Sequence, residues 1–174
     1  VWLYMEKEKE QWQKLFPQKP MVALNNTLTG VDEMVNYKPE LNKEDLKKKY
    51  DIQEEIVFIF CARFTADRRI DLLLESLKRL DAKKYGFVII GEGASKPDFS
   101  TFKNVHDFGA VYDTAIKREL FVLADIYFQP GWVGLSIVEA MAYGKPIFTF
   151  ERSVETLQCV EYSYIKNGEN GLIF

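Results

Sequence analysis

The chain has 174 residues, of which 47% are hydrophobic, so it is long and apolar enough for one globular domain with a substantial core. A formal net charge of −3 and a pI of about 5.4 argue against a broadly nucleic-acid-binding surface. Two cysteines give no disulfide framework, and a single histidine excludes a metal site of clustered histidines. No signal peptide and no membrane-spanning apolar run are visible, and the composition suits a cytosolic or membrane-peripheral enzyme.

Short apolar runs alternate with segments of helical spacing along the chain. In chain order, the pattern predicts a helix over 4–15, a strand over 21–24, a helix over 42–50, a strand over 56–61, a helix over 69–80, strands over 87–90 and 105–108, a helix over 113–123, a strand over 126–128, a helix over 134–143, a strand over 147–150, a helix over 151–163 and a turn over 167–171. Such alternation is typical of a parallel α/β fold.

The predicted fold is a doubly wound, mostly parallel, Rossmann-like sheet of about six strands. Such sheets bind ligands at the carboxyl ends of their strands, near the point where the strand order reverses. The loops 62–69, 91–95, 109–113 and 129–135 each follow a predicted strand. We therefore expect these loops to meet at one edge of the sheet.

The most informative stretch, residues 130–146, reads Pro-Gly-Trp-Val-Gly-Leu-Ser-Ile-Val-Glu-Ala-Met-Ala-Tyr-Gly-Lys-Pro. A tight loop leads into a helix that begins near Gly134, and the unpaired N–H groups of a first helical turn form an anion site. Glu139 follows one turn later, where a carboxylate can accept hydrogen bonds from vicinal hydroxyls such as those of a ribose. Phosphate and ribose sites side by side indicate a nucleotide. The alternative is a helix packed on the sheet without a ligand.

Two arginines follow the central strand. Arg63 and Arg68 can hold a diphosphate, because the planar guanidinium offers several fixed donors and stays charged. The alternative is a pair of solvated surface arginines. Gly91 and Gly93 allow close approach of the backbone to a ligand, although Gly-x-Gly alone is more often a turn. They do not begin a Gly-x-Gly-x-x-Gly fingerprint, because Lys96 stands at the third glycine position.

Residues 130–146 resemble the nucleotide-sugar-binding segment of group 1 glycosyltransferases, retaining enzymes with two facing Rossmann-like domains (the GT-B architecture). In that family a Gly-Leu pair precedes Glu-Ala-Met-Ala-x-Gly-x-Pro, and here Gly134-Leu135 precedes a matching run that begins at Glu139 and ends at Pro146. Residues 62–74 are similar to the family's Gly-Arg-Leu…Lys-Gly-x-Asp-x-Leu-Leu element. Arg63 matches the family arginine, and Arg68 stands where the family has a lysine.

The resemblance implies a role for each candidate site residue. Arg63 and Arg68 would be the catalytic cations, because they stabilise the departing diphosphate as its negative charge develops. The implied diphosphate-binding residues are Arg63, Arg68, Gly134, Leu135 and Ser136, the ribose-binding residue is Glu139, and the residues bordering the nucleobase are Gly91, Gly93, Val105 and His106. His106 is equally compatible with a bystander role on its strand. No metal and no separate cofactor are implied, since the co-substrate is a nucleoside diphosphate sugar of the UDP, GDP or ADP type.

One position departs from the family pattern. The family usually has a first glutamate, which contacts the transferred sugar, eight positions before the second, and here that position is Gly131. The departure leaves open a variant donor-sugar site. It also motivates an alternative function, a non-catalytic GT-B-like domain that binds a nucleotide or a partner protein. A dinucleotide-dependent oxidoreductase would share the sheet, but the glycine fingerprint is absent.

The resemblance covers residues 22–174, which we expect to be the nucleotide-sugar-binding domain, truncated at its C-terminus. Residues 1–21 resemble the last helix and hinge of a missing N-terminal acceptor domain. The implied reaction is hexosyl transfer from a nucleoside diphosphate sugar to a hydroxyl, with retained configuration, in polysaccharide or glycoconjugate synthesis. The fragment alone is expected to be inactive. The parent enzyme is expected in the cytoplasm or at the cytoplasmic face of the membrane, with any membrane contact made through the missing domain.

Overall fold

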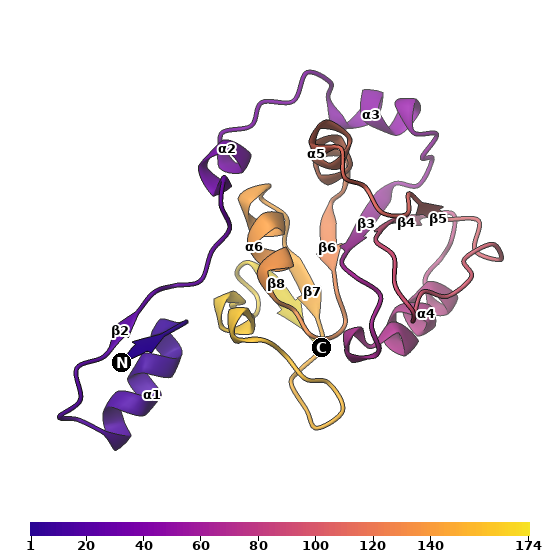
Figure 1. Cartoon of the computed structure of the whole chain (residues 1–174). Helices are drawn as coiled ribbons and strands as arrows, with labels where there is room; N and C mark the ends of the chain where they lie inside the picture. The colour runs from indigo at the N-terminus through magenta and orange to yellow at the C-terminus, as the bar shows by residue number, and fades with distance from the viewer.

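The structure, a computed structural model, describes all residues from 1 to 174. It consists of a small N-terminal β-α-β unit and a larger domain built on a six-stranded sheet (Figure 1). The elements are β1 (Trp2–Leu3), α1 (Glu6–Leu15), β2 (Val22–Ala23), α2 (Val31–Val35), α3 (Lys43–Lys49), β3 (Ile56–Cys61), α4 (Ile70–Arg79), β4 (Tyr85–Ile90), β5 (Val105–Asp107), α5 (Thr114–Leu123), β6 (Ile126–Phe128), α6 (Leu135–Ala142), β7 (Ile147–Thr149) and β8 (Gly171–Ile173), with 3₁₀ turns at Ala66–Arg68 and Val160–Tyr164.

The large sheet is parallel throughout, and its strand order is β5-β4-β3-β6-β7-β8. This is the order of a doubly wound Rossmann sheet. The strands are added toward one edge of the sheet from β3 to β5 and toward the other edge from β6 to β8, so the order switches between β3 and β6. Phe58 and Ile59 of β3 lie opposite Ile126 and Tyr127 of β6 at this switch point. The sheet confirms the predicted doubly wound, Rossmann-like fold of about six strands.

Helices cover both faces of the sheet because the strands carry apolar side chains on both sides. Along β3, Val57 and Ile59 join the core under α5 and α6, whereas Phe58 and Phe60 join the core under α4. The buried helix residues on the first face are Leu120, Phe121, Leu123, Ile137 and Ala140, and those on the second are Ile70, Leu73 and Leu77. The two cores fix the strand ends and the helices that follow them.

Two helices begin at the residues that the sequence indicates as caps. Asn42 Oδ1 accepts a hydrogen bond from the Asp45 N–H at 3.0 Å at the start of α3. Asp113 Oδ1 accepts from the N–H groups of Ala115 at 2.8 Å and Ile116 at 3.2 Å at the start of α5. Each cap satisfies donors that the helix itself cannot pair.

The predicted helix over 151–163 is wrong, because only the 3₁₀ turn at its end forms. The backbone of this segment pairs instead with the loop before α6. Trp132 N donates to Leu157 O at 2.8 Å, and Cys159 N donates to Val133 O at 3.2 Å. Two backbone groups of this segment therefore bond to a distant loop and are not available for hydrogen bonds within a helix. The sequence pattern also does not predict the short helix α2.

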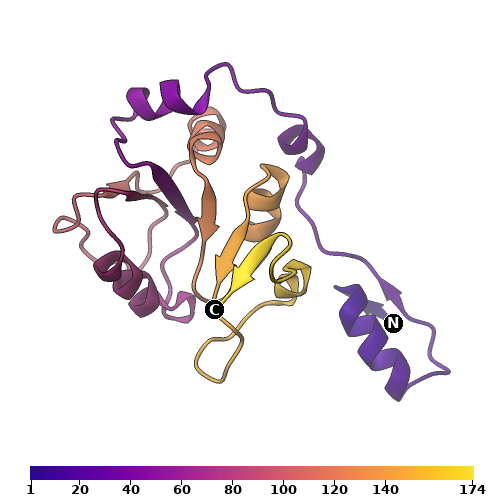
Figure 2. The ribbon, with the colours of Figure 1, turned by 180° about the vertical axis from the view of Figure 1, so that it is seen from behind.

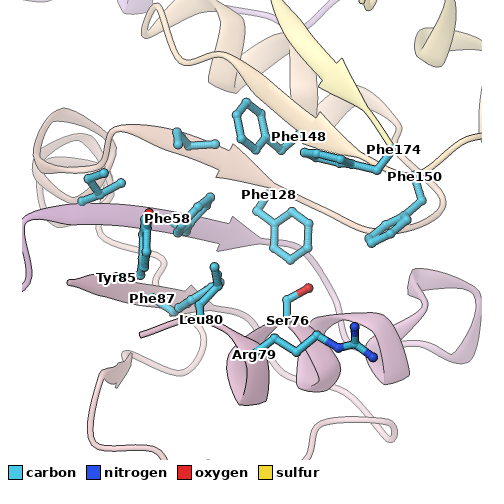
Figure 3. A pocket seen from close by; sticks show the side chains of 12 residues that line it. Phe58, Ser76, Arg79, Leu80, Tyr85, Phe87, Phe128, Phe148, Phe150 and Phe174 are labelled. Carbon is cyan, nitrogen blue, oxygen red and sulfur yellow. The ribbon is translucent and has the colours of Figure 1, made fainter. Parts of the chain in front are cut away.

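The face of the sheet that α4 covers also carries an apolar groove of about 540 Å³ (Figure 3). Its lining residues are Ile56, Phe58, Ser76, Arg79, Leu80, Tyr85, Phe87, Ile126, Phe128, Phe148, Phe150 and Phe174. Figure 3 shows the phenylalanines lying along the strands beside α4. The groove contains one cationic side chain and no carboxylate, so its chemistry does not suit a nucleotide.

The N-terminal unit lies to one side of the large sheet (Figures 1 and 2). Its strands β1 and β2 pair in parallel, and an extended segment leads from β2 to α2, which packs against α6. Tyr164 OH donates to Asn26 O at 2.9 Å, so this connecting segment contacts the end of the sheet domain. None of the helices is both long enough and apolar enough to cross a membrane.

Candidate functional site

A cavity of about 510 Å³ lies at the carboxyl ends of β3 and β4. Its lining residues are Cys61, Ala62, Arg63, Ile90, Gly91, Glu92, Gly93, Ala110, Val111, Tyr112, Lys117 and Glu139. Three of the four loops that the sequence places at this edge contribute to the lining. The fourth loop, which precedes α6, contributes none of the lining residues, and α6 itself contributes Glu139. The cavity lies beside the switch point, where ligands of doubly wound sheets bind.

Gly91 and Gly93 are required by packing at this edge. A β-carbon on Gly91 would lie 2.0 Å from Ala62 O, and one on Gly93 would lie 2.1 Å from Phe64 O. The backbone after β4 therefore runs against the backbone after β3, with no room for a side chain between them. The two glycines form part of the cavity wall for this structural reason, whatever the cavity binds.

Glu139 and Lys117 form an ion pair at the cavity wall. Lys117 Nζ donates to Glu139 Oε2 at 2.7 Å, and the two side chains are 30% and 12% exposed. Burial alone would lower the pKa of Lys117, but Cys61 and Glu139 outweigh it and raise that pKa above its usual value. Glu139 Oε1 accepts no hydrogen bond from the chain, so it is free to accept one from a ligand.

Cys61 also lines the cavity, at the end of β3. Burial raises the pKa of its thiol to about 12, with a lowering contribution from Lys117 and a raising one from Glu139. At neutral pH the residue is therefore a thiol and not a nucleophilic thiolate. The chain has no group of three or more His, Cys, Asp and Glu side chains that could hold a metal ion.

Gln129, which the sequence reasoning missed, organises the loop before α6. Its side chain is fully buried, and its Nε2 donates to Gly131 O at 3.0 Å and to Trp132 O at 2.8 Å. Its Oε1 accepts from Tyr127 OH at 2.7 Å and from Ser136 Oγ at 3.0 Å. The sequence carries one signal for this role, an amide side chain directly after an apolar strand.

Three backbone donors are free where this loop enters α6. The N–H groups of Gly134, Leu135 and Ser136 donate to no acceptor in the chain. Such a helix start favours an anion, through its free donors and through the helix dipole. The Ser136 hydroxyl is already used by Gln129. The backbone groups of these residues, and not the serine hydroxyl, are therefore available to a phosphate.

The structure places the two candidate arginines differently. Arg63 is exposed, lines the cavity and makes no hydrogen bond within the chain. Arg68 does not line the cavity: its Nη1 donates to Trp132 O, and its Nε is buried without an acceptor. A buried donor without a partner is uncommon, and the guanidinium that carries it keeps its positive charge against the loop before α6.

Gly131 lies in the loop before α6, at a point where there is no room for a side chain. A β-carbon there would be 2.8 Å from Arg69 Cγ and 2.8 Å from Asp67 O. Gly131 N also donates to Arg68 O at 3.2 Å, which holds the loop against this segment. The position that carries a glutamate in the family pattern is therefore sterically closed in this chain.

Val105 and His106 are not brought to the cavity. Both lie on β5, and His106 Nε2 is 3.0 Å from Glu54 Oε2. The arrangement gives His106 a structural partner on the segment before β3. Of the residues expected to border a nucleobase, only Gly91 and Gly93 line the cavity.

Comparison with known proteins agrees with this geometry. Residues 42–174 match the family model described as glycosyl transferases group 1. A Klebsiella pneumoniae protein, described as an uncharacterized 41.2 kDa protein in the cps region, is 29% identical over 128 residues, which make up 70% of this chain and 33% of that protein.

Two solved structures show the same fold at low sequence identity. A glycosyltransferase from Rickettsia africae has a TM-score of 0.67 at 18% identity, over 99% of this chain and 48% of that chain. HepE from Anabaena, solved in complex with UDP-glucose, has a TM-score of 0.69 at 14% identity, over 100% of this chain and 49% of that chain. This chain thus spans about half the length of these proteins. The strand order, the strand-end cavity and the match over residues 42–174 lead to one conclusion: the chain belongs to the group 1 glycosyl transferase family.

Proposed function

We propose that this chain is the donor-binding domain of a retaining glycosyltransferase. The reaction is transfer of a hexosyl group from a nucleoside diphosphate sugar to a hydroxyl of an acceptor. The observation that carries the proposal is the cavity at the carboxyl edge of the sheet, where Glu139 stands one turn into a helix whose first N–H groups are free. The likeness to HepE, which was solved with UDP-glucose, supports the same class of ligand.

The proposed pose follows from charge and from unsatisfied hydrogen-bonding groups. The diphosphate lies at the free N–H groups of α6, where Arg63 and Arg68 are the cations that stabilise it as the sugar leaves. The ribose hydroxyls donate to Glu139, whose Oε1 is free. The nucleobase lies in the part of the cavity bordered by Gly91 and Gly93. No step in this scheme requires a metal or a cofactor beyond the sugar nucleotide.

We further propose that residues 1–21 belong with an N-terminal acceptor domain and residues 22–174 with the donor domain. The acceptor site and part of the active site then lie outside this chain. The chain alone binds a nucleotide and does not transfer the sugar. The parent enzyme acts in the cytoplasm or at the cytoplasmic face of a membrane, in polysaccharide or glycoconjugate synthesis.

A thermal-shift panel of UDP, GDP, ADP and NAD tests the ligand class on the 174-residue chain. A ligand present at one hundred times its dissociation constant stabilises the folded state by about 2.7 kcal/mol. We expect at least one nucleoside diphosphate to raise the melting temperature and NAD to leave it unchanged. A response to NAD alone would favour a dinucleotide-dependent oxidoreductase and contradict the proposal.

Gly131 supports one alternative, a nucleotide- or partner-binding domain that transfers nothing. The full-length parent, incubated with UDP-glucose, UDP-galactose, UDP-N-acetylglucosamine and GDP-mannose, separates the two functions. Turnover of one donor, with the anomeric configuration of the product read by NMR, tests both transfer and retention. Nucleotide binding without turnover of any donor, by transfer or by hydrolysis, would favour the non-catalytic alternative.

A further inference from the structure

Glu161 is a buried carboxylate with an incomplete set of partners. Its residue surface is only 4% exposed, and its Oε1 accepts from Asn26 Nδ2 at 2.5 Å. No other N–H or O–H of the chain donates to this carboxylate, so its Oε2 has no partner and no basic side chain bonds to it. The other buried glutamate, Glu54, has His106 as its partner. Of the two buried glutamates, Glu161 is therefore the one whose carboxylate has no basic side chain within hydrogen-bonding distance.

The unpaired oxygen lies beside the start of α6. A β-carbon on Gly134 would stand 3.9 Å from Glu161 Oε2 and 3.7 Å from Cys159 Sγ. Gly134 is the first of the three residues whose N–H groups are free. Glu161 does not line the cavity that Glu139 lines, so it extends the polar site around the helix start beyond that cavity.

The chemistry of these two neighbours restricts what can lie between them. Oε2 of Glu161 receives no hydrogen bond from the chain, so a ligand that binds favourably beside it supplies O–H or N–H groups. The free N–H groups of α6 attract an anion, whereas Glu161 repels one. The ligand that satisfies both is anionic at one end and carries neutral hydroxyls at the other, as a sugar phosphate does.

We propose that Glu161 is a donor-binding residue that accepts hydrogen bonds from hydroxyls of the transferred sugar. This inference rests on the proposed function and assigns the sugar end of the same ligand. Asn26 positions the carboxylate by occupying Oε1, which leaves Oε2 for the sugar. Because Gly131 has no room for a side chain, the sugar-facing carboxylate comes from the segment after β7 and not from the loop before α6.

The test compares each sugar nucleotide with UDP or GDP alone, which lack the sugar. Affinities of UDP, UDP-glucose, UDP-galactose, UDP-N-acetylglucosamine, GDP and GDP-mannose are measured by calorimetry for wild type and Glu161→Gln. Glu161→Gln keeps the size of the side chain and an acceptor for Asn26, but replaces one acceptor oxygen with a donor. Glu161→Asp keeps the carboxylate but shortens the side chain by one methylene. It replaces Glu161→Gln in the experiment if that variant fails to fold. Glu155→Gln, an exposed carboxylate on the same segment, is the matched control.

We expect Glu161→Gln to weaken the preferred sugar nucleotide about tenfold and to change UDP or GDP less than twofold. Glu161→Asp should show the same selective loss, and Glu155→Gln should show none. Equal affinities in wild type and variants, or equal losses for the nucleotide with and without sugar, overturn the role of Glu161 while leaving the proposed function intact. Wild-type protein that binds none of these nucleotides, and neither ADP nor ADP-glucose, overturns the proposed function, and this inference with it.

Discussion

Lys117 of α5 donates to the carboxylate of Glu139 of α6 at 2.7 Å, and so joins two helices that cover the same face of the sheet. The contact uses Oε2 and leaves Oε1 without a donor from the chain. The same pair therefore holds the carboxylate in place and leaves half of its accepting capacity for a ligand. Both residues line the cavity at the sheet edge.

Replacing Glu139 with glutamine tests the ribose site. The variant keeps the size of the side chain but turns one acceptor oxygen into a donor, so one hydrogen bond from a ribose hydroxyl is weakened or lost. We expect at least a tenfold loss of affinity for UDP, on the order of 1.4 kcal/mol, measured by calorimetry. The 2′,3′-dideoxy nucleotide should bind wild type and variant alike. An equal loss for both ligands would make Glu139 a structural residue.

Arg68→Ala tests the diphosphate site. We expect the affinity for UDP to fall by about 1.5–3 kcal/mol, as for a charge-assisted contact, while uridine is unaffected. Arg79→Ala, which alters a cation in the apolar groove, is the matched control and should change neither ligand. Because Arg68 also donates to Trp132 O, unfolding curves of the variant are needed beside the titrations. A parallel loss for uridine would show that the arginine supports the loop and not the phosphate.

Gly131→Ala tests whether the loop before α6 is closed to side chains. The added β-carbon would meet Arg69 Cγ and the Asp67 carbonyl at 2.8 Å, so we expect a loss of about 1–3 kcal/mol in the free energy of unfolding. Gly134→Ala is the control, because its nearest contact would be an ordinary 3.7 Å to Cys159 Sγ. Urea denaturation of both variants gives the comparison. Equal stabilities would mean that the loop can move aside and that a glutamate could be restored there.

Glu119 of α5 provides a test of how stability depends on pH. Hydrogen bonds from Lys49, at 2.6 Å, and from Tyr50 lower the pKa of Glu119 below its usual value of 4.5. A depressed folded-state pKa stabilises the protein above the unfolded pKa, and this stabilisation is lost as pH falls through the folded value. Glu119→Gln should therefore lower the melting temperature at pH 7, and the difference from wild type should shrink below about pH 4.5.

The matched control for that series is Glu75→Gln, which removes an exposed i,i+4 pair with Arg79. Such a pair contributes little, so the melting temperature should change by a small amount at any pH. If the difference in melting temperature between wild type and Glu119→Gln stayed constant from pH 7 to pH 3, the lowered pKa of Glu119 would not be the cause of the stabilisation.

Much of the fold was predictable because local patterns and tertiary packing agree. The apolar run 56–61 matches β3 at both ends, since a strand buried on both faces needs no polar positions. Asn42 and Asp113 mark helix starts because their side chains bond to backbone donors a few residues away. The helix predicted over 151–163 is wrong for the opposite reason, because two of the segment's backbone groups bond to a loop about 25 residues earlier in the chain.

The site was predictable only where the backbone defines it. Arg63, Gly91, Gly93 and Glu139 follow strand ends or a loop-to-helix junction, and the structure brings all four to one cavity. His106 has the same kind of position, but its side chain pairs with Glu54 instead.

The residues missed by the sequence are polar groups whose roles depend on tertiary partners. Lys117 and Glu161 look like ordinary charges of a helix and a loop. Only the packing of α5 and of the segment after β7 against α6 shows what they face. Single-sequence patterns carry no information about such contacts.

The buried amide of Gln129 has a consequence for binding kinetics. It fixes two carbonyls of the loop before α6, a tyrosine hydroxyl and a serine hydroxyl in one network. These hydrogen bonds are already formed before any ligand arrives, so we expect association to require no ordering of this loop. Differences in affinity among ligands held at this point should appear mainly in their dissociation rates, with association rates nearly constant.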